Sequence, residues 1–363
     1  MNKTSIIRLL VVFFGGILCS CLPSSTQTPA PNSDGSAVTT TWRLESMPQK
    51  KESQSILYLF FNQKNSDLLT IIDLGQSGIG FYEGTPSNLS LIFSLSPKGI
   101  SPSLWDPPCA FGGTKFCTPD ELVAPFYLPT LSTLAFDETI GDYFGIVNYH
   151  HYQTGASSSN FPMDIFRLNA SSLDKKKIAL PLQDGTLPLF FSDMNHKTIY
   201  AFAPDSVNLW EWNDSDGSWN KISFAGLPSG RKIAAFAYDS KNKILFAGDD
   251  SGGILTSSDF LTWKSWGTGS LRTGNTKELF FDPDKNLLIA VTTAAEIYSS
   301  MNGGAWTLLL DAKSMGTNIR ISDISHLTYH PVEKRFYGVI SYQNTNKTPA
   351  SNNQSLASFL LVP

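Results

Sequence analysis

One short segment recurs along this chain and determines the fold we expect: YDSKNKILFAG at Tyr238–Gly248 and FDPDKNLLIAV at Phe281–Val291. Related copies are FDETIGDYFGI from Phe136, SDMNHKTIYAF from Ser192, YHPVEKRFYGV from Tyr329 and, more weakly, FNQKNSDLLTI from Phe61. Each copy places an Asp, Asn or His before a polar turn, and an apolar strand follows the turn. This order is typical of a β-hairpin.

The copies are regularly spaced. Their polar anchor residues stand at positions 62, 137, 193, 239, 282 and 330, in steps of 75, 56, 46, 43 and 48 residues. The residue eight places after each anchor is small where a strand would pass a crowded neighbour: Gly145, Ala201, Ala247, Ala290 and Gly338, with Thr70 in the weaker copy. A unit of about 45 residues with four short strands is typical of a propeller blade.

We therefore predict an all-β, six-bladed β-propeller over residues 40–363. A seventh blade hidden in 100–127 is the alternative, whereas a two-sheet sandwich does not repeat at this spacing. The last unit supplies only three strands, near Ser325–His330, Phe336–Tyr342 and Leu356–Leu361. We expect the N-terminal strand Thr40–Met47 to complete that blade, because it would close the ring and cover an open sheet edge.

A second pattern runs beside the first. Trp219, Trp263 and Trp306 each follow a turn rich in Ser, Asn and Asp. Such side chains bond to their own turn backbone, so we predict hairpin turns with the tryptophans as structural blade anchors. The pattern resembles the Asp-box of sialidase-like propellers, although the tryptophan comes one residue early. The resemblance implies a propeller fold and says little of activity, because the Asp-box lies away from the active site in that family.

The sialidase resemblance also suggests an enzyme, and the sequence does not support it. Sialidases hold their substrate with three arginines and carry an Arg-Ile-Pro motif near the start; here the nearest match is Phe166-Arg167-Leu168. No nucleophile elbow, phosphate-binding loop or dinucleotide motif occurs. We expect no catalytic residues and no cofactor. A carbohydrate-active propeller enzyme of sialidase or glycosidase type remains the alternative, with carboxylates such as Asp106, Asp120 and Glu121 as candidates.

The N-terminus reads as an export signal. Lys3 and Arg8 precede the apolar stretch Leu9–Ile17, which is too short to span a bilayer. The following Leu18-Cys19-Ser20-Cys21 resembles the lipobox of bacterial lipoproteins, which implies lipidation of Cys21. A cleaved signal peptide with a chance cysteine is the alternative. We assign 1–20 to the signal peptide and 21–39, rich in Ser, Thr and Pro, to a flexible tether.

Cysteine usage agrees with export. Cys109 and Cys117 are separated by seven residues in a Pro- and Gly-rich stretch, and in an oxidising compartment they would form a local disulfide. The alternative is half of a metal site, but no nearby Cys or His completes it, so we expect no metal. The net charge is −4, without a basic cluster, which argues against a nucleic-acid partner.

The long insertions are expected on one face. If the strands of each blade alternate in direction, all four insertions fall in connections that share a face: Ser96–Leu128, Tyr149–Pro162, Ala312–Ile324 and Gln343–Ser355. Binding sites are usually built on such loops. Our candidate binding residues on this face are Trp105, Asp106, Tyr149, His150, His151 and Tyr152. Adjacent histidines on a strand point apart, so we do not expect His150 and His151 to bind a metal together.

The sequence therefore predicts a lipid-anchored binding or assembly scaffold in the bacterial envelope. By fold it resembles the propeller lipoproteins that help assemble outer-membrane proteins or photosystems. Leu22 is not the Asp that retains lipoproteins in the inner membrane, which favours the outer membrane or the cell surface. We expect a monomer that binds a protein or a glycan and contacts the membrane through its lipid alone.

The anchor is directly testable. Changing Cys21→Ser should abolish incorporation of labelled fatty acid and release the protein from membranes, because the acceptor thiol is gone. Cys19→Ser is the matched control and should leave labelling intact. Continued labelling of the Cys21→Ser protein would overturn the lipobox assignment.

Overall fold

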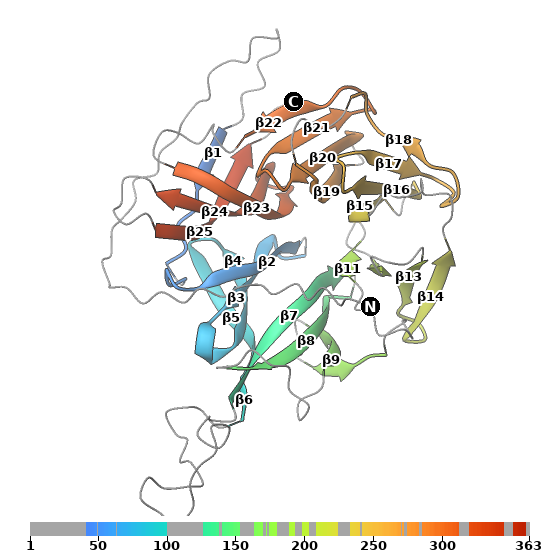
Figure 1. Ribbon diagram of the computed structural model, residues 1–363. Coiled ribbons are helices and arrows are strands. Elements are labelled where there is room, and N and C mark those ends of the chain that lie inside the picture. Colours follow the sequence, from blue (N-terminus) through green and yellow to red (C-terminus); the bar gives the residue numbers. More distant parts are fainter. Residues whose placement is uncertain are drawn as a thin grey trace, which may run out of the picture.

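The computed structural model is a ring of six β-sheets around a central channel (Figure 1). It describes most of the chain between residues 41 and 360. Outside the description lie 1–40, 100–125, 153–162, 180–188, 193–197, 203–207, 224–232, 312–318, 345–350, 361–363 and several one- or two-residue stretches. The six sheets confirm the expected all-β, six-bladed β-propeller.

Each blade is an antiparallel sheet, and in blades 1, 3, 4 and 5 the strands follow chain order from the channel outward. Blade 1 contains β2 (Ser55–Asn62), β3 (Asp67–Asp73), the short 3-10 turn η1 (Gly75–Ser77), β4 (Ile79–Thr85) and β5 (Asn88–Leu95). Blade 2 contains β6 (Lys98–Gly99), β7 (Phe126–Asp137), β8 (Asp142–His151), β9 (Asp164–Asn169) and β10 (Lys175–Lys177). Blade 3 contains β11 (Leu189–Ser192), β12 (Ile199–Phe202), β13 (Asn208–Asn213) and β14 (Ser218–Ser223).

The remaining blades follow the same plan. Blade 4 contains β15 (Ile233–Asp239), β16 (Ile244–Asp249), β17 (Ile254–Ser257) and β18 (Lys264–Ser265). Blade 5 contains β19 (Thr276–Asp282), β20 (Leu287–Thr292), β21 (Ile297–Met301) and β22 (Thr307–Leu310). Blade 6 contains β23 (Ile319–His330), β24 (Arg335–Asn344), β25 (Ser351–Leu360) and the N-terminal β1 (Thr41–Leu44).

The ring closes as expected, through pairing of the two ends of the described chain. Strand β1 pairs antiparallel with β25, with Trp42 opposite Phe359. Both side chains are buried, at 3% and 0% exposure, in the apolar cluster between blades 5 and 6. The blue strand therefore lies among the red strands in Figure 1.

The repeated polar anchor is explained by the hairpin turn after each inner strand. Asp137, Asp239 and Asp282 each accept a hydrogen bond from the backbone N–H three residues ahead, at 3.3–3.4 Å. His330 does the same through Nδ1, which explains why a histidine can replace the aspartate. The fourth residue after the anchor has a left-handed φ in every described copy: Ser66, Gly141, Lys243, Asn286 and Lys334.

The small residues of the repeat lie on the second strand of each blade, where the neighbouring side chains leave no room. A Cβ atom added at Gly145 would come within 2.6 Å of Phe166 and 2.8 Å of Leu134. Ala201, Ala247 and Ala290 are fully buried, each between two neighbouring strands of its own blade. The periodic small residue therefore reflects packing.

Six apolar clusters fill the six interfaces between neighbouring blades. The cluster between blades 6 and 1 joins Leu59 and Phe61 of β2 to Tyr337 and Val339 of β24. Each sheet therefore buries both faces, each against a different neighbour.

The three tryptophan turns are hairpins between the third and fourth strands, as expected. Asn213 Oδ1 accepts from the backbone N–H of Ser215, and Asp259 Oδ1 accepts from those of Leu261 and Thr262. These two backbone bonds lower the pKa of Asp259 below its ordinary value. Trp219, Trp263 and Trp306 are only partly buried, against the edges of three interface clusters. Each tryptophan therefore packs against a blade interface without being fully buried.

The predicted insertions are shorter than expected, because parts of all four are strand. Strand β7 continues back to Phe126 and β8 continues to His151, while β6 pairs with the start of β7. In blade 6, β23 begins at Ile319, β24 ends at Asn344, and Ser351 pairs with Asn344. Blades 2 and 6 thus each extend a three-stranded ribbon toward the face opposite the hairpin turns, which we call the insertion face.

Ring closure makes a strong prediction. Trp42→Ala should lower the free energy of unfolding by about 3–5 kcal/mol, because a large buried side chain leaves a cavity between blades 5 and 6. Arg43→Ala is the control in the same strand; its side chain is 43% exposed and pairs with Glu45, so we expect a loss of about 1 kcal/mol or less.

Truncation tests the same closure more severely. Removing Leu356–Pro363 should unfold the domain, because that part of β25 lies between β1 and β24. Chemical denaturation with circular dichroism measures both effects. Equal losses for Trp42→Ala and Arg43→Ala, or a truncated chain that melts normally, would contradict the closure.

Candidate functional site

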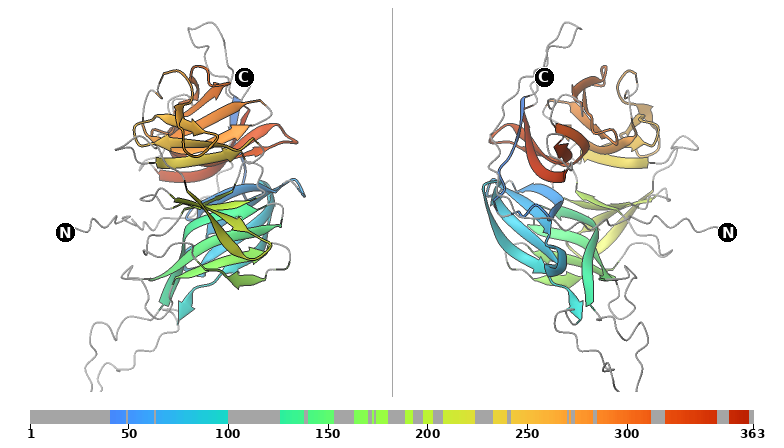
Figure 2. Two further views of the ribbon diagram at one scale, coloured as in Figure 1. Left: turned by 90° about the vertical axis from the view of Figure 1, so that its right-hand side faces the viewer. Right: turned by 60° about the vertical axis from the view of Figure 1, so that its left-hand side comes forward.

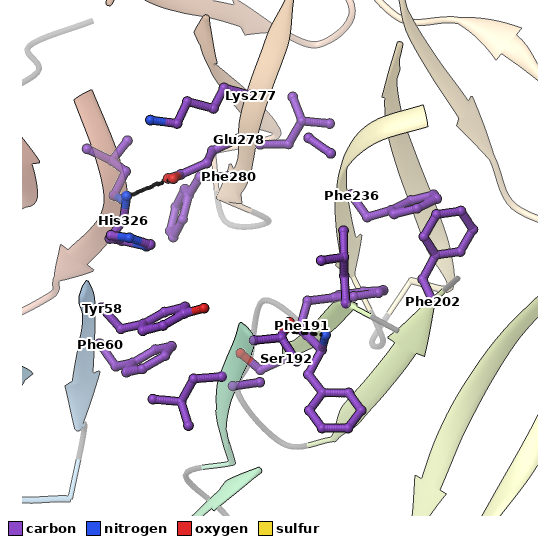
Figure 3. Close-up of a pocket in the computed structure, with 18 of the residues that line it drawn as sticks. Tyr58, Phe60, Phe191, Ser192, Phe202, Phe236, Lys277, Glu278, Phe280 and His326 are labelled. Carbon is purple, nitrogen blue, oxygen red and sulfur yellow. Dashed lines mark hydrogen bonds between the residues drawn. The ribbon is translucent and has the colours of Figure 1, made fainter. Parts of the chain in front are cut away.

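The central channel contains a cavity of about 370 Å³ lined by the inner strands of all six blades (Figure 3). On these strands the lining residues precede the anchor of the hairpin turn. In β11 and β15 they include the first strand residue, Leu189 and Ile233. In the longer strands β7 and β23 the lining residues fall in the half nearer the hairpin turn, so the cavity lies inside the channel between the two faces.

A repeated β-bulge shapes the cavity wall. The pairing of the inner strand with its neighbour shifts by one residue in blades 1, 2, 4 and 5, which leaves Leu57, Ser132, Ala234 and Lys277 unpaired. All four stand five places before their anchor. A bulge redirects side chains away from the regular alternation. As a result Ser132 and Ala234 are exposed to the cavity, although the following residues Thr133 and Ala235 are buried.

Aromatic rings form most of the wall. Tyr58 and Phe60 stack with centroids 6.1 Å apart on one side of the cavity, and Phe191 and Phe236 stack at 5.7 Å on another (Figure 3). Phe280 of β19 supplies a third side. All five are partly exposed. The channel is therefore an apolar space with accessible ring faces.

The charged groups of the cavity hold blade 5 to blade 6. Lys277 Nζ donates to Asp323 Oδ1 at 2.5 Å and to the carbonyl oxygen of Ile324 at 3.1 Å. The Glu278 carboxylate accepts the backbone N–H groups of His326 and Leu327 at 2.8 and 3.1 Å. Both side chains are thus committed to structural bonds.

His326 is the unusual residue of the site. Two residues of β23, His326 and Leu327, bulge between the paired positions Ser325 and Thr328, and His326 has a φ of +54°. Its ring lies against Tyr58 with centroids 4.9 Å apart. Neither ring nitrogen takes part in a hydrogen bond among the described residues. Burial lowers the pKa of His326 and Lys277 lowers it further, while Glu278 and Asp323 act in the opposite direction.

The sequence-predicted residues of the insertion face lie in the ribbon of blade 2. Tyr149, His150 and His151 belong to β8 and pair with Pro129, Leu128 and Tyr127, so the expected loop is strand here. Tyr149 is buried at 6% exposure under Lys98, and it is therefore part of the core. Tyr152, just beyond β8, is 39% exposed.

Hydrogen bonds tie both ribbons to blade 1. The Gln354 side chain of blade 6 accepts the backbone N–H of Ile56 at 2.5 Å. Gln76 of η1 donates to the Tyr152 hydroxyl at 2.5 Å. Blades 6, 1 and 2 therefore form one continuous part of the insertion face.

Several predicted residues cannot be placed. Cys21, Trp105, Asp106, Cys109 and Cys117 lie outside the described residues, as do Asp120 and Glu121. Within the described part of the chain, no three His, Cys, Asp or Glu side chains gather as a metal site would need, and no helix has the length and apolar character to cross a membrane.

Sequence reasoning missed the channel residues. One signal was present: Phe60, Phe191 and Phe280 stand two places before their anchors, on strands expected to face the channel. The partial exposure of those phenylalanine side chains depends on how the six blades are arranged around the channel, which no single repeat encodes. No arginine lines the cavity among the described residues. Arg167 instead contacts Asp142 and Asp214.

The histidine predicts a pH dependence. The unfolded chain takes up a proton near pH 6.5, whereas burial beside Tyr58 and Lys277 favours the neutral imidazole, against Glu278 and Asp323. The unfolded state therefore binds more protons just below that pH, and the free energy of unfolding should fall on acidification from pH 7 to 5.

Denaturation curves at both pH values measure this effect. The His326→Asn variant should lose less stability over the same interval, because Asn tolerates a left-handed φ and does not titrate. Parallel losses in the two proteins would contradict this account.

Comparisons with known proteins agree with the fold. Residues 193–348 match the family described as DUF6242 beta propeller domain, which covers less than half of the chain. A search of curated proteins finds no match.

Among solved structures, the WD40 repeats of RRP9 give a TM-score of 0.48 at 10% identity, over 93% of this chain and 100% of that one. TolB from Acinetobacter baumannii gives 0.47 at 9% identity, over 76% of this chain and 60% of that one. A chain of a nidogen/laminin complex gives 0.45 at 12% identity, over 81% and 98%. The family match shows that residues 193–348 are similar to the DUF6242 beta propeller domain.

Proposed function

We propose that this protein is a lipid-anchored scaffold of the bacterial envelope that binds a protein or glycan partner through its insertion face. The observation that carries the proposal is the asymmetry of the ring. The hairpin turns on one face are short, whereas both extended ribbons project toward the other face. Rigid scaffolds commonly carry their binding surfaces on such elaborated ends.

The ribbons suit a binding role because they are held firmly. Each is three-stranded, and each is bonded to blade 1 through Gln354 or Gln76. A partner would therefore meet a surface that loses little conformational entropy on binding. Tyr152 stands on this surface with an amphipathic ring, the kind of side chain that is enriched at interfaces.

The charges of the channel favour binding over glycoside hydrolysis. A glycosidase needs two carboxyl groups free to act on the substrate. Glu278 and Asp323, the carboxylates of the cluster beside the channel, are engaged with backbone N–H groups and with Lys277. Sialidase-like recognition of a carboxylate by arginines has no support in the cavity lining either.

The anchor completes the proposal. Lipidation of Cys21 followed by a tether of 21–39 would hold the propeller near the membrane, and Leu22 favours the outer membrane or the cell surface. The Ser-, Thr- and Pro-rich part of the tether at 23–39, a coil of about 17 residues, spans roughly 20–25 Å, so partners in that membrane or close to it are within reach.

The insertion face can be tested with paired surface variants. Tyr152→Ser should reduce partner capture from envelope extracts, because it removes both an exposed ring and the hydrogen bond from Gln76 that holds the ribbon; Val332→Ser, 71% exposed in a hairpin turn on the other face, should not. Both proteins should melt within a few degrees of the original, because neither side chain is in the core. Capture is measured by pull-down with the soluble domain and mass spectrometry.

The opposite pattern would refute the proposed surface. Loss of capture with Val332→Ser, and normal capture with Tyr152→Ser, would place the binding surface on the hairpin-turn face.

A further inference from the structure

We propose that the central channel binds a small, uncharged aromatic molecule that carries one hydrogen-bonding group, recognised by His326. This inference concerns a site separate from the insertion-face surface and does not depend on the membrane anchor. It rests on the size of the cavity, the nature of its walls, the state of its charges and the geometry of His326.

Size and walls point to a ring-shaped ligand. A cavity of about 370 Å³ falls within the range of small-molecule sites, which are concave, mostly apolar and few per protein. Pairs of stacked rings stand on separate sides, Tyr58 with Phe60 and Phe191 with Phe236 (Figure 3). Aromatic ligands pack against such rings in offset or edge-to-face contacts, which add to the gain from burial.

The charges exclude a strongly charged ligand. Lys277 and Glu278 already have partners of opposite charge or backbone partners, so a bound ion would have to break those bonds or stay unpaired in an apolar space. Leaving a buried charge unpaired is costly. An uncharged molecule avoids that cost.

The polar side chains of the cavity wall also disfavour a sugar, because each of its several hydroxyl groups would need a hydrogen-bond partner. Thr133 Oγ1 is engaged with the backbone of Phe190, and Ser132 Oγ accepts a bond from Asn148. The walls therefore offer few free side-chain groups. One hydrogen-bonding group on the ligand can be satisfied, whereas a ring of hydroxyls cannot.

His326 supplies that single contact. Its left-handed φ holds the ring against Tyr58 at the cavity wall, and its ring nitrogens make no hydrogen bond within the described structure. Backbone strain in a residue other than glycine is often found where a side chain must be held for function. A neutral imidazole carries one donor and one acceptor and can bond either type of ligand group.

The cavity can be reached from outside. Leu189, the first residue of β11, lines the cavity and is 44% exposed. Solvent therefore reaches the cavity wall at Leu189.

A fluorescent aromatic dye tests the site. We expect the uncharged dye phenylnaphthylamine to bind the folded domain with a rise in fluorescence. Ala234→Trp should weaken binding at least about tenfold, because the bulged residue 234 points its side chain into the cavity. Ala294→Trp is the matched control: Ala294 is also exposed but lies in a turn of blade 5 outside the cavity, and its variant should bind within about twofold of the original.

A second variant that fills the cavity shows whether a loss of binding comes from blocking the site or from misfolding. Ser132→Trp fills the cavity from β7, across a different wall, and should have the same effect as Ala234→Trp. Each variant is checked by its melting temperature. Dye binding that survives in both folded variants, or no binding to the original protein, would overturn the proposal.

The hydrogen bond is tested by competition. Naphthol should displace the dye at lower concentration than naphthalene, by about five- to tenfold, which is the typical worth of one hydrogen bond. In His326→Gly, which tolerates the left-handed φ and carries no hydrogen-bonding side chain, the two compounds should become nearly equal. Comparing the two compounds in the same protein cancels any loss of packing against the histidine ring, because both compounds lose it equally. An unchanged ratio in the variant would remove His326 from the site, and equal competition in the original protein would exclude a hydrogen-bonding group.

Discussion

Each blade of this protein is apolar on both faces, and this constraint governs the rest of the structure. A sheet of that kind is stable only between two neighbours, as the six clusters at the six blade interfaces show. An open row of blades would expose one apolar face at each end, so the chain must form a ring. The β1–β25 pairing fastens the ring by building one blade from both ends of the domain, with Trp42 and Phe359 buried together.

Closure also determines where function can be placed. Once the ring is closed, the inner strands enclose a channel and the two sets of connections are separated on opposite faces. Bulges occur at equivalent positions of four inner strands, and three of the bulged residues, Ser132, Ala234 and Lys277, line the channel cavity. In blade 6 a two-residue bulge replaces the single one and brings His326 to the wall. The same scaffold therefore carries two distinct surfaces, the ribbons of the insertion face and the aromatic channel.

The sequence was sufficient for the elements that depend on local chemistry. The anchors, the hairpin turns and the small residue of the second strand recur in each repeat because every blade meets the same local demands. The number of blades and the N-terminal closing strand followed from their spacing. The ends of the strands could not be predicted in this way. The extensions of β7, β8, β23 and β24 depend on pairing between segments whose sequences show no regular alternation of apolar and polar residues.

The candidate sites were less predictable for the same reason. Tyr149 was expected in a loop and is buried. Its contacts, with Lys98 and with the core between blades 1 and 2, are long-range, so the local sequence does not reveal them. The tryptophans lie at the edges of the interface clusters, and their partial exposure depends on neighbouring blades. The role of His326 depends on a bulge and on residues of β2 and β19, so a single repeat contains no sign of it.

Native-state hydrogen exchange on the full chain tests the central claim most directly. If the ring is closed by β1, the amide groups of Thr41–Leu44 that pair with β25 should exchange only through global unfolding. Their opening free energy should then equal that of the β24 amides in the same blade. Exchange of the β1 amides at the rate of exposed turns, while β24 stays protected, would show that the strand is an appendage and that the ring is held together without it.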